Sequence, residues 1–507
     1  MTKTKQKKDV FHAKTKLIDI QEWWELAVLI NENQAWEYWI SDMDKVCLTY
    51  KWEEIVLDVN LTHRYVDLHE VGIMKDVSEK YGIQSGEIVA IHFTQTSVQA
   101  LDALKKWLKW WKLDYKEIYA IMKDISENRF TDTLVTYFSA IWFFRESSDE
   151  ELYQMAKAMA QTGEMLHFKW VVADKHCMWW VPWNETTMIM IPLLSSLGIK
   201  MPKTFSKSIT TPAATWECVN VLMDISFDKK QIENLVKKNN CCLVWGGGLD
   251  LAPADEKLIK VAYPLSMQSY SRTIISIMAK KYAMWINHSL IDIPVGPTAK
   301  VPDIKTAKLL KKKYEYVWKK LWMKVHVEIT KADQPIGAWI WPVLQTREVL
   351  RVLQQHELRP MDLQDKAVYL SSKIIELVWL AKWKKAYELA YKQLKSWKAW
   401  EKMQKIIKAQ NGKDPNIKSE ELKLWEFKKE VKAGRDGRVR SIDLKLINGT
   451  ARMLWSPVDE HAWLYLNKKI GDVVKKNDII YVMYADDENR INLALESLKG
   501  KKMYFIK

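Results

Sequence analysis

The chain has 507 residues, of which 48% are hydrophobic and 28% charged, and its formal net charge is +15 at pH 7. This composition is typical of a folded soluble protein of roughly three domains. The positive charge favours anionic ligands, although a lysine-rich surface that binds nothing would give the same balance. The 5 cysteines are scattered and form no CxxC pair, which argues against a disulfide framework and against a zinc site.

A cytoplasmic location is expected from two features. The basic N-terminal stretch "MTKTKQKKDV" is not followed by an apolar segment of the kind found in signal peptides. The apolar run "TMIMIPLLSSLGI" is shorter than the roughly 18 residues that a membrane helix requires. Together with the cysteine usage, this predicts a protein of a reducing compartment.

Residues 1–98 are predicted to form a β-rich domain, because short runs such as "LAVLI", "KVCLTY" and "EIVAIHF" alternate there with polar turns. From residue 99 the period changes to that of helices. Asp114 with Glu117 has the form of a capping box ahead of an apolar helical face. Residues 99–168 are therefore expected to form a helical lobe, in which residues 264–284 also pack.

Residues 169–430 are predicted to form an α/β domain. The apolar runs "TMIMIPLL", "CCLVWGG", "SLIDIPVG" and "KVHVEIT" are interpreted as strands that alternate with helical patterns. Helical periodicity dominates residues 362–410. Residues 431–507 contain the strand-like runs "VRSIDLKLIN" and "GDVVKKNDIIYVMYA", typical of a barrel-sandwich-like β-rich domain. The predicted class is α/β: a helical lobe and a mixed α/β sheet domain form a cleft, flanked by small β-rich domains.

Tryptophan is unusually frequent and glycine unusually rare, with 27 Trp against 16 Gly, although glycine averages about 7% of residues. The segment "DKHCMWWVPWNETT", residues 174–187, places three tryptophans beside a proline where loops normally carry glycine. A surface for single-stranded nucleic acid is one interpretation. Such surfaces gather their aromatic residues on one face, whereas these tryptophans fall at turn positions along the whole chain.

Several long motifs occur in a fixed order and together indicate a family. They are "DKHCMWWVPWNETT", "PKTFSKSITTPAAT", "CCLVWGGGLDLAPADE", "SIMAKKYAM", "LIDIPVG", "QPIGAWIWP" and "KAWEKM…DPNIK". With them the chain closely resembles the archaeal-type AMP phosphorylases, which belong to the thymidine and pyrimidine nucleoside phosphorylase family. The resemblance runs nearly end to end and includes the N-terminal β domain that shorter bacterial thymidine phosphorylases lack.

The resemblance explains the tryptophans, because the family carries glycine where this chain has Trp179, Trp180, Trp183, Trp285, Trp318, Trp322, Trp341, Trp397, Trp455 and Trp463. Only Trp245 and Trp400 match tryptophans of the family. Glycine at all other tryptophan positions would bring the glycine content to about 8%, close to average usage. We hypothesise that the source organism reads UGA as glycine and that the printed sequence was translated with UGA as tryptophan. Only glycine reaches positive φ readily and lets backbone N–H groups approach an anion closely.

The resemblance implies phosphorolysis, in which inorganic phosphate attacks C1′ of the ribose while the base departs. It implies that residues 169–430 bind phosphate and that no metal or organic cofactor is needed. The residues expected to bind AMP and phosphate are Trp180 (as glycine), Ser206, Lys207, Ser208, Ile209, Thr210, Thr211, Thr215, Ser276 and Lys300, with His176, Thr187 and Lys280 as additional candidates. Capped loops, solvated lysines and structural histidines are the ordinary alternatives.

Three positions depart from the family pattern. Glu185 stands where the family has lysine, so its carboxylate either points away from bound phosphate or weakens phosphate binding. Lys207 replaces an arginine and keeps the charge without the bidentate geometry. Gln268 stands at the position of the catalytic aspartate that donates a proton to the base, and an amide cannot transfer a proton. The proton would then come from water or from another acid such as Asp255 or Asp292, or turnover would be slow or lost.

The leading interpretation is an AMP phosphorylase, a pentosyltransferase of nucleotide salvage that releases free base and ribose 1,5-bisphosphate, with other nucleoside monophosphates as further candidate substrates. The alternatives are a pyrimidine or thymidine nucleoside phosphorylase, a phosphoribosyltransferase of related fold, and a catalytically impaired nucleotide-binding homologue. AMP and phosphate are the expected ligands, and neither nucleic acid nor a membrane is an expected partner. The resemblance implies a homodimer or larger homo-oligomer.

Overall fold

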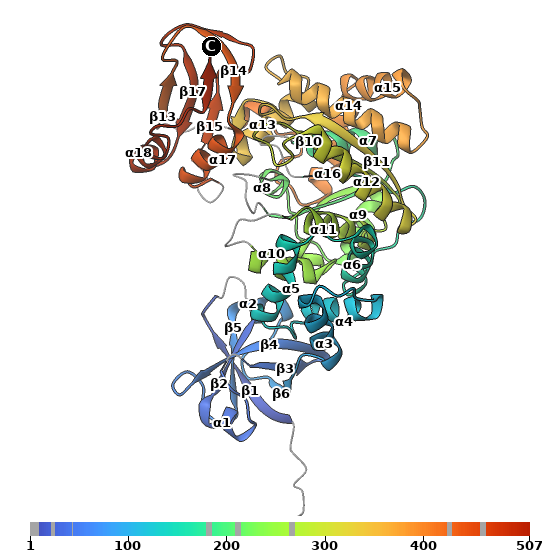
Figure 1. The fold of residues 1–507 in the computed structure, drawn as a ribbon, viewed down its shortest axis with the longest axis vertical. Helices are drawn as coiled ribbons and strands as arrows, with labels where there is room; N and C mark the ends of the chain where they lie inside the picture. Colours follow the sequence, from blue (N-terminus) through green and yellow to red (C-terminus); the bar gives the residue numbers. More distant parts are fainter. Residues whose placement is uncertain are drawn as a thin grey trace, which may run out of the picture. The chain divides into compact units, whose positions relative to one another are not determined.

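The structure, a computed structural model, describes residues 10–21, 26–42, 44–178, 185–207, 214–262, 269–422, 428–456 and 463–507. The chain divides into two compact units, residues 1–146 with 253–267 and residues 147–252 with 268–507. Both contain helices and strands, which confirms the predicted mixed α/β class (Figure 1). The division into four domains stays a prediction. Within the described ranges, no helix is both long enough and apolar enough to cross a membrane.

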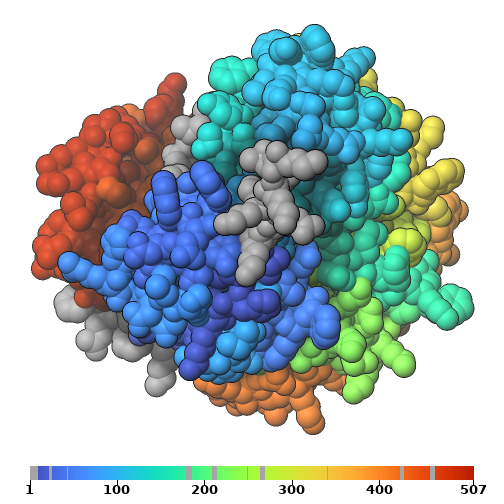
Figure 2. Space-filling model, turned by 90° about the horizontal axis from the view of Figure 1, so that it is seen from below, coloured from blue at the N-terminus to red at the C-terminus, as the bar shows by residue number. Residues whose placement is uncertain are grey.

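The first unit begins with a closed barrel of strands in the order β1-β5-β2-β4-β3-β6, whose residues are the blue atoms of Figure 2. β1 pairs with both β5 and β6, which closes the barrel. Side chains such as Val28, Leu48 and Ile91 fill its interior. Its elements are β1 (Val10–Ile18), β2 (Ala27–Asn31), α1 (Glu32–Glu37), β3 (Lys45–Tyr50), β4 (Glu53–Thr62), β5 (Glu70–Met74), α2 (Lys75–Tyr81) and β6 (Ile88–Thr94).

Helices make up the rest of the first unit. Asp114 and Glu117 form the predicted capping box at the start of α4. Trp107 is fully buried, and its indole N–H donates a hydrogen bond to the Phe138 carbonyl at 3.1 Å, which joins α3 to α5. The helices are α3 (Val98–Leu108), α4 (Tyr115–Ser126), α5 (Asp132–Phe144) and α10 (Pro253–Ala262).

The second unit is built around parallel strands. β10 lies between β11 and β7, and all of its residues are buried, as expected of a strand covered on both faces. β8 and β9 form a second parallel pair, and a parallel bridge between Val172 and Lys200 links the two sheets. The strands are β7 (Ala173–Cys177), β8 (Met201–Phe205), β9 (Cys241–Trp245), β10 (His288–Val295) and β11 (Lys324–Lys331).

The strand predicted for "TMIMIPLL" is wrong, because these residues belong to helix α7 (Thr186–Ser196). Residues 186–195 are all buried, so the helix is apolar on every side and its sequence shows no helical period. The helices around it are α6 (Asp149–Gln161), α8 (Thr215–Asn220), α9 (Lys229–Asn239), α11 (Tyr270–Ala283), α12 (Ile304–Lys320), α13 (Pro342–Leu353), α14 (Met361–Leu377), α15 (Lys384–Lys395) and α16 (Lys398–Ala409).

The C-terminal part of the second unit holds two small antiparallel sheets, ordered β12-β15-β17-β13 and β16-β14-β18. The strand predicted for "VRSIDLKLIN" is only half correct, because β14 ends at Ile442 and the Asp443 side chain caps a helix, α17. The elements are β12 (Trp339–Ile340), β13 (Lys428–Lys432), β14 (Gly437–Ile442), α17 (Leu444–Met453), β15 (Trp463–Leu466), β16 (Val473–Val474), β17 (Ile479–Tyr484), α18 (Glu488–Ser497) and β18 (Tyr504–Ile506).

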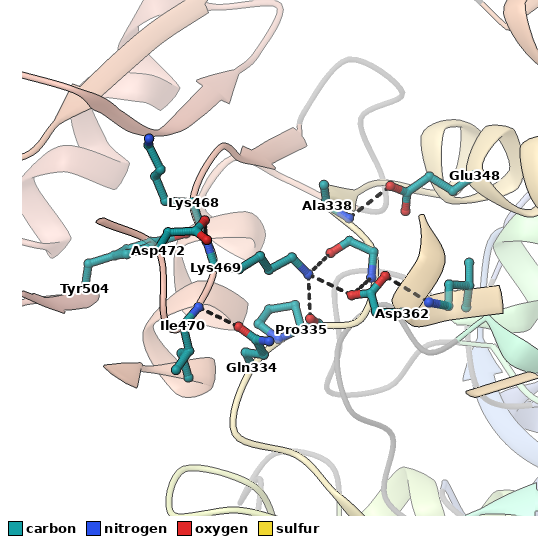
Figure 3. Close-up of polar contacts among 12 residues, drawn as sticks. Gln334, Pro335, Ala338, Glu348, Asp362, Lys468, Lys469, Ile470, Asp472 and Tyr504 are labelled. Carbon is teal, nitrogen blue, oxygen red and sulfur yellow. Dashed lines mark hydrogen bonds and ion pairs between the residues drawn. The ribbon is translucent and has the colours of Figure 1, made fainter. Parts of the chain in front are cut away.

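Lys469 ties this C-terminal part to the loop before β12 (Figure 3). Its Nζ donates to the carbonyl oxygen of Pro335 at 2.7 Å and to that of Gly337, and it lies 3.2 Å from Asp362 Oδ2. The Ala338 N–H of the same loop donates to Glu348 Oε1, and burial raises the pKa of Glu348 to about 7. One ammonium group thus serves three acceptors, two of which are backbone atoms.

Candidate functional site

A buried group of charges lies where β7 meets β8 and α11. Asp174 Oδ2 on β7 lies 2.5 Å from Lys281 Nζ on α11, and Asp174 Oδ1 lies 3.3 Å from Lys203 Nζ on β8. Lys203 Nζ also donates to the backbone carbonyl of Lys175 at 2.6 Å. Asp174, Lys175, Lys203 and Lys281 are all buried. Two ammonium groups, those of Lys203 and Lys281, therefore contact a single carboxylate, and this excess of positive charge away from water favours a bound anion.

The surroundings shift the pKa values of this group. Burial lowers the pKa of Lys203 to about 7, although Asp174 opposes the shift. Desolvation, followed by Lys281 and Lys203, holds the pKa of His176 well below its ordinary value. His176 is therefore neutral at pH 7, and its Nδ1 has no hydrogen-bond partner within the described ranges. A neutral imidazole offers the site a hydrogen bond but no charge.

The N-terminus of α7 adds hydroxyl groups and a carboxyl group beside Lys175. Lys175 Nζ donates to Thr186 Oγ1 at 3.0 Å, and the next residue, Thr187, is also buried. Glu185 Oε2 accepts a hydrogen bond from Thr215 Oγ1 at 3.2 Å. Burial raises the pKa of Glu185 to about 7, because Thr215 and Lys175 offset its effect only in part. The Glu185 side chain is thus directed at Thr215 and is neutral in a large share of molecules at pH 7.

The end of β8 approaches α11 and β9. Lys280 Nζ on α11 donates to Ser206 Oγ at 3.5 Å. Lys207 Nζ lies 5.0 Å from the ring centre of Trp216 and 5.1 Å from that of Trp245, in a cation–π arrangement. The structure therefore brings together residues that the sequence assigned to separate motifs.

Lys300 lies in the loop after β10. Burial, followed by the charge of Arg272 on α11, lowers the pKa of Lys300 to about 8. The loop approaches the backbone closely at Gly296, where a Cβ atom would lie 2.0 Å from the Ala332 carbonyl oxygen. Only glycine fits there, so the conformation of this lysine loop depends on it.

The predicted site residues fall into two groups. Outside the described residues lie Trp180, Ser208, Ile209, Thr210, Thr211 and Gln268, whose roles stay predictions. The second unit contains the described candidates, which are His176, Thr187, Ser206, Lys207, Thr215, Ser276, Lys280 and Lys300. In the part of the chain that the structure describes, no three His, Cys, Asp or Glu side chains gather in a way that could hold a metal ion.

Asp292 is poorly suited to replace the missing proton donor. Its side chain is fully buried, lies 3.3 Å from Lys366 Nζ and accepts a hydrogen bond from Thr330 Oγ1 at 2.5 Å. Burial would raise its pKa, but Lys366 and Lys175 together hold the pKa below its ordinary value. A carboxylate that stays ionised at neutral pH has no proton to give to a leaving base.

Comparison with curated proteins adds sequence similarity to this geometry. An AMP phosphorylase of Methanocaldococcus jannaschii is 32% identical over 483 residues, which cover 95% of each chain. An AMP phosphorylase of Thermococcus kodakarensis is 35% identical over 469 residues, 92% of each chain. This chain belongs to the AMP phosphorylases of the thymidine phosphorylase family.

Two further comparisons concern the C-terminal domain and the fold. Residues 439–504 match the family model for the pyrimidine nucleoside phosphorylase C-terminal domain. Anthranilate phosphoribosyltransferase from Thermus thermophilus matches with a TM-score of 0.51 and 12% identity over 61% of this chain and 99% of that chain. The enzyme from Saccharomyces cerevisiae matches with a TM-score of 0.50 over 62% and 98%. These structures show a shared fold and nothing more.

Sequence reasoning missed the charges at the centre of this AMP phosphorylase family member, namely Asp174, Lys175, Lys203 and Lys281. A signal was present. Lys203 lies in a short strand in which both of its sequence neighbours are buried, and lysine is almost never fully buried without a partner. A charged residue inside an otherwise buried strand could therefore have been counted as a site candidate.

Proposed function

We propose that this chain catalyses the phosphorolysis of AMP. A phosphate oxygen forms a bond to C1′ of the ribose, the bond from C1′ to the base breaks, and its electron pair leaves with adenine. The products are adenine and ribose 1,5-bisphosphate, and the enzyme is a phosphate-dependent pentosyltransferase. Similarity to AMP phosphorylases at 32–35% identity over nearly the whole chain supports this assignment.

The observation that carries the proposal is the buried group formed by Asp174, Lys175, Lys203 and Lys281. A phosphate dianion beside it would balance the excess of ammonium groups and would raise the pKa of Lys203, which burial lowers to about 7. The adjacent N-terminus of α7 also favours an anion, through the helix dipole and the Thr186 hydroxyl. We therefore assign the attacking phosphate to this group.

We assign the nucleotide to the ring of polar groups around the ends of β8 and β10. Ser206, Lys207 and Lys280 supply hydroxyl and ammonium donors to the AMP phosphate, and Lys300 supplies a further cation. Gln268, outside the described residues, would donate only an amide hydrogen bond to the base. The proton that adenine gains is then supplied by water.

A second candidate is a pyrimidine nucleoside phosphorylase, because the C-terminal family model carries that name. The two functions differ in whether the substrate bears a 5′-phosphate. Release of free base from AMP, CMP, UMP, adenosine and thymidine, followed by chromatography with and without phosphate, separates them. Adenine release from AMP but not from adenosine supports the proposal, and thymine release without adenine release overturns it.

The same assay tests the phosphate site. Lys281→Met removes one of the cations beside Asp174, and Lys384→Met removes a lysine whose side chain is 89% exposed. The first variant should lose phosphate-dependent activity and the second should keep it. The proposal also includes a cytoplasmic location, a homodimer or larger assembly, and activity without a metal or organic cofactor. Sedimentation would test the assembly, and activity in the presence of a chelator would test the independence of a metal.

A further inference from the structure

Tryptophan occupies backbone conformations that side chains avoid. In the described ranges, ten of the eighteen non-glycine residues with positive φ are tryptophans, with φ between 54° and 78°. Four others are asparagine, the residue that tolerates this region best after glycine. For a bulky aromatic residue a positive φ is an outlier. The ten are Trp39, Trp52, Trp110, Trp170, Trp285, Trp322, Trp379, Trp383, Trp397 and Trp455.

Many of these residues end helices in the manner of glycine. After α3, the Trp110 N–H donates to the Trp107 carbonyl at 2.9 Å, and the Trp111 N–H donates to the Lys106 carbonyl at 3.1 Å. These two bonds are the Schellman motif, whose left-handed residue is usually glycine. The same pair of bonds recurs at Trp39, Trp285, Trp322, Trp379 and Trp455, after α1, α11, α12, α14 and α17.

Helix α7 provides an internal standard for this motif. Its last residue, Ser196, and the C-cap Leu197 are followed by Gly198, which has a φ of 86°. The Gly198 N–H donates to the Ser195 carbonyl at 3.1 Å, and the Ile199 N–H donates to the Leu194 carbonyl at 3.3 Å. The chain therefore uses glycine in the same geometry in which it shows tryptophan elsewhere.

The ten indole side chains contribute little to packing. All are exposed, from 42% for Trp285 to 99% for Trp52, so burial does not compensate for the strained backbone. A functional aromatic surface would not require a positive φ at each of its members. The ten positions, from Trp39 to Trp455, have in common only that the backbone requires a positive φ.

Several buried tryptophans also fit their positions poorly, which is an observation independent of the backbone angles. A buried indole N–H is normally bonded. Among the described residues, five indole N–H groups are buried without a hydrogen-bond partner, those of Trp142, Trp216, Trp318, Trp341 and Trp463. Trp107, whose N–H is bonded to Phe138, shows the ordinary arrangement. The unpartnered indoles are therefore also poorly fitted to their positions.

We propose that the natural polypeptide carries glycine at the ten positive-φ positions, because the cells that make it read UGA as glycine. One reassigned codon places the same wrong residue at many glycine positions at once. Ten separate substitutions of glycine by tryptophan would each have to be tolerated. The proposal rests on backbone geometry and exposure, so it stands or falls independently of the proposed activity.

A single segment of the natural protein, residues 390–403, tests the proposal with its own control. It contains Trp397, with a φ of 64°, and Trp400, which lies inside α16 and is 6% exposed. Tandem mass spectrometry of the protein isolated from its source should find glycine at 397 and tryptophan at 400, with UGA and UGG as the respective codons. Tryptophan at 397 overturns the proposal. Glycine at both positions overturns the claim that backbone geometry identifies the affected residues.

Discussion

Replacing Trp110 by glycine is expected to stabilise the end of helix α3, whereas replacing its neighbour Trp111 is expected to destabilise it. The two side chains are 55% and 57% exposed and follow the same helix. Only Trp110 has a positive φ, 63°. Both variants lose an exposed indole, but only Trp110→Gly also removes the strain of a positive φ, so comparing them isolates the effect of that strain.

The expected magnitudes follow from the backbone. A left-handed conformation costs an ordinary residue about 1–2 kcal/mol. Glycine removes that cost, but its greater freedom in the unfolded chain lowers the stability of the folded state by roughly 0.4–1 kcal/mol. Trp110→Gly should therefore stabilise the helix end by about 0.5–1 kcal/mol. Trp111→Gly brings only the entropic loss, about 0.5–1 kcal/mol, and removes the ring that lies 5.5 Å from Lys109 Nζ. The two variants should differ by about 1–2 kcal/mol, or about 5–30-fold in a local opening equilibrium.

Hydrogen exchange of the α3 amides, measured by mass spectrometry on the full chain, reports this local equilibrium. Exchange should become slower than in the parent protein for Trp110→Gly and faster for Trp111→Gly. If both variants exchange faster by the same factor, the tryptophan at 110 is not strained, and the reasoning that assigns glycine to the helix ends is refuted.

Three further predictions concern the site. Between pH 4.5 and 7 only the unfolded chain loses the Glu185 proton, so stability falls with rising pH by about 3 kcal/mol in total, and Glu185→Gln should remove this slope in urea unfolding. Glu348→Gln should flatten the slope equally but leave the phosphate affinity, measured by calorimetry, unchanged. If both variants changed the phosphate affinity equally, Glu185 would have no specific role in binding phosphate. Lys281→Met should lower kcat/KM for phosphate at least about tenfold, because Asp174 loses a cation at 2.5 Å, and an unchanged value in steady-state kinetics would exclude this group from the site. Gln268→Asp should raise kcat by about 10²-fold, whereas an unchanged kcat would mean that the base receives its proton by another route.

The fold could be predicted from sequence where a pattern is local. β10 is a short apolar run bounded by turns, and α4 begins with a capping box, so both were recognisable. Helix α7 was not, because a helix buried on all sides lacks the polar stripe that reveals the helical period. β14 was extended too far because Asp443, which ends it by capping α17, lies within an otherwise strand-like run.

The site was predictable only in part, for a related reason. Ser206, Thr215 and Lys280 belong to motifs that the resemblance supplies. The group of Asp174 and its lysines forms only when β7, β8 and α11 come together, and no spacing along the chain encodes that contact. The orientation of Glu185 towards Thr215 is likewise a tertiary contact between two helix N-termini.

The attachment made by Lys469 bears on how the C-terminal part of the protein can diverge. Its acceptor at Pro335 is a main-chain oxygen, which almost any amino acid would present at that place. Substitutions in the loop therefore leave this contact intact as long as the path of the chain is kept, whereas loss of the lysine ammonium group removes it. A chimaera with the C-terminal segment of a relative should keep this contact only if the incoming segment brings a lysine to this point.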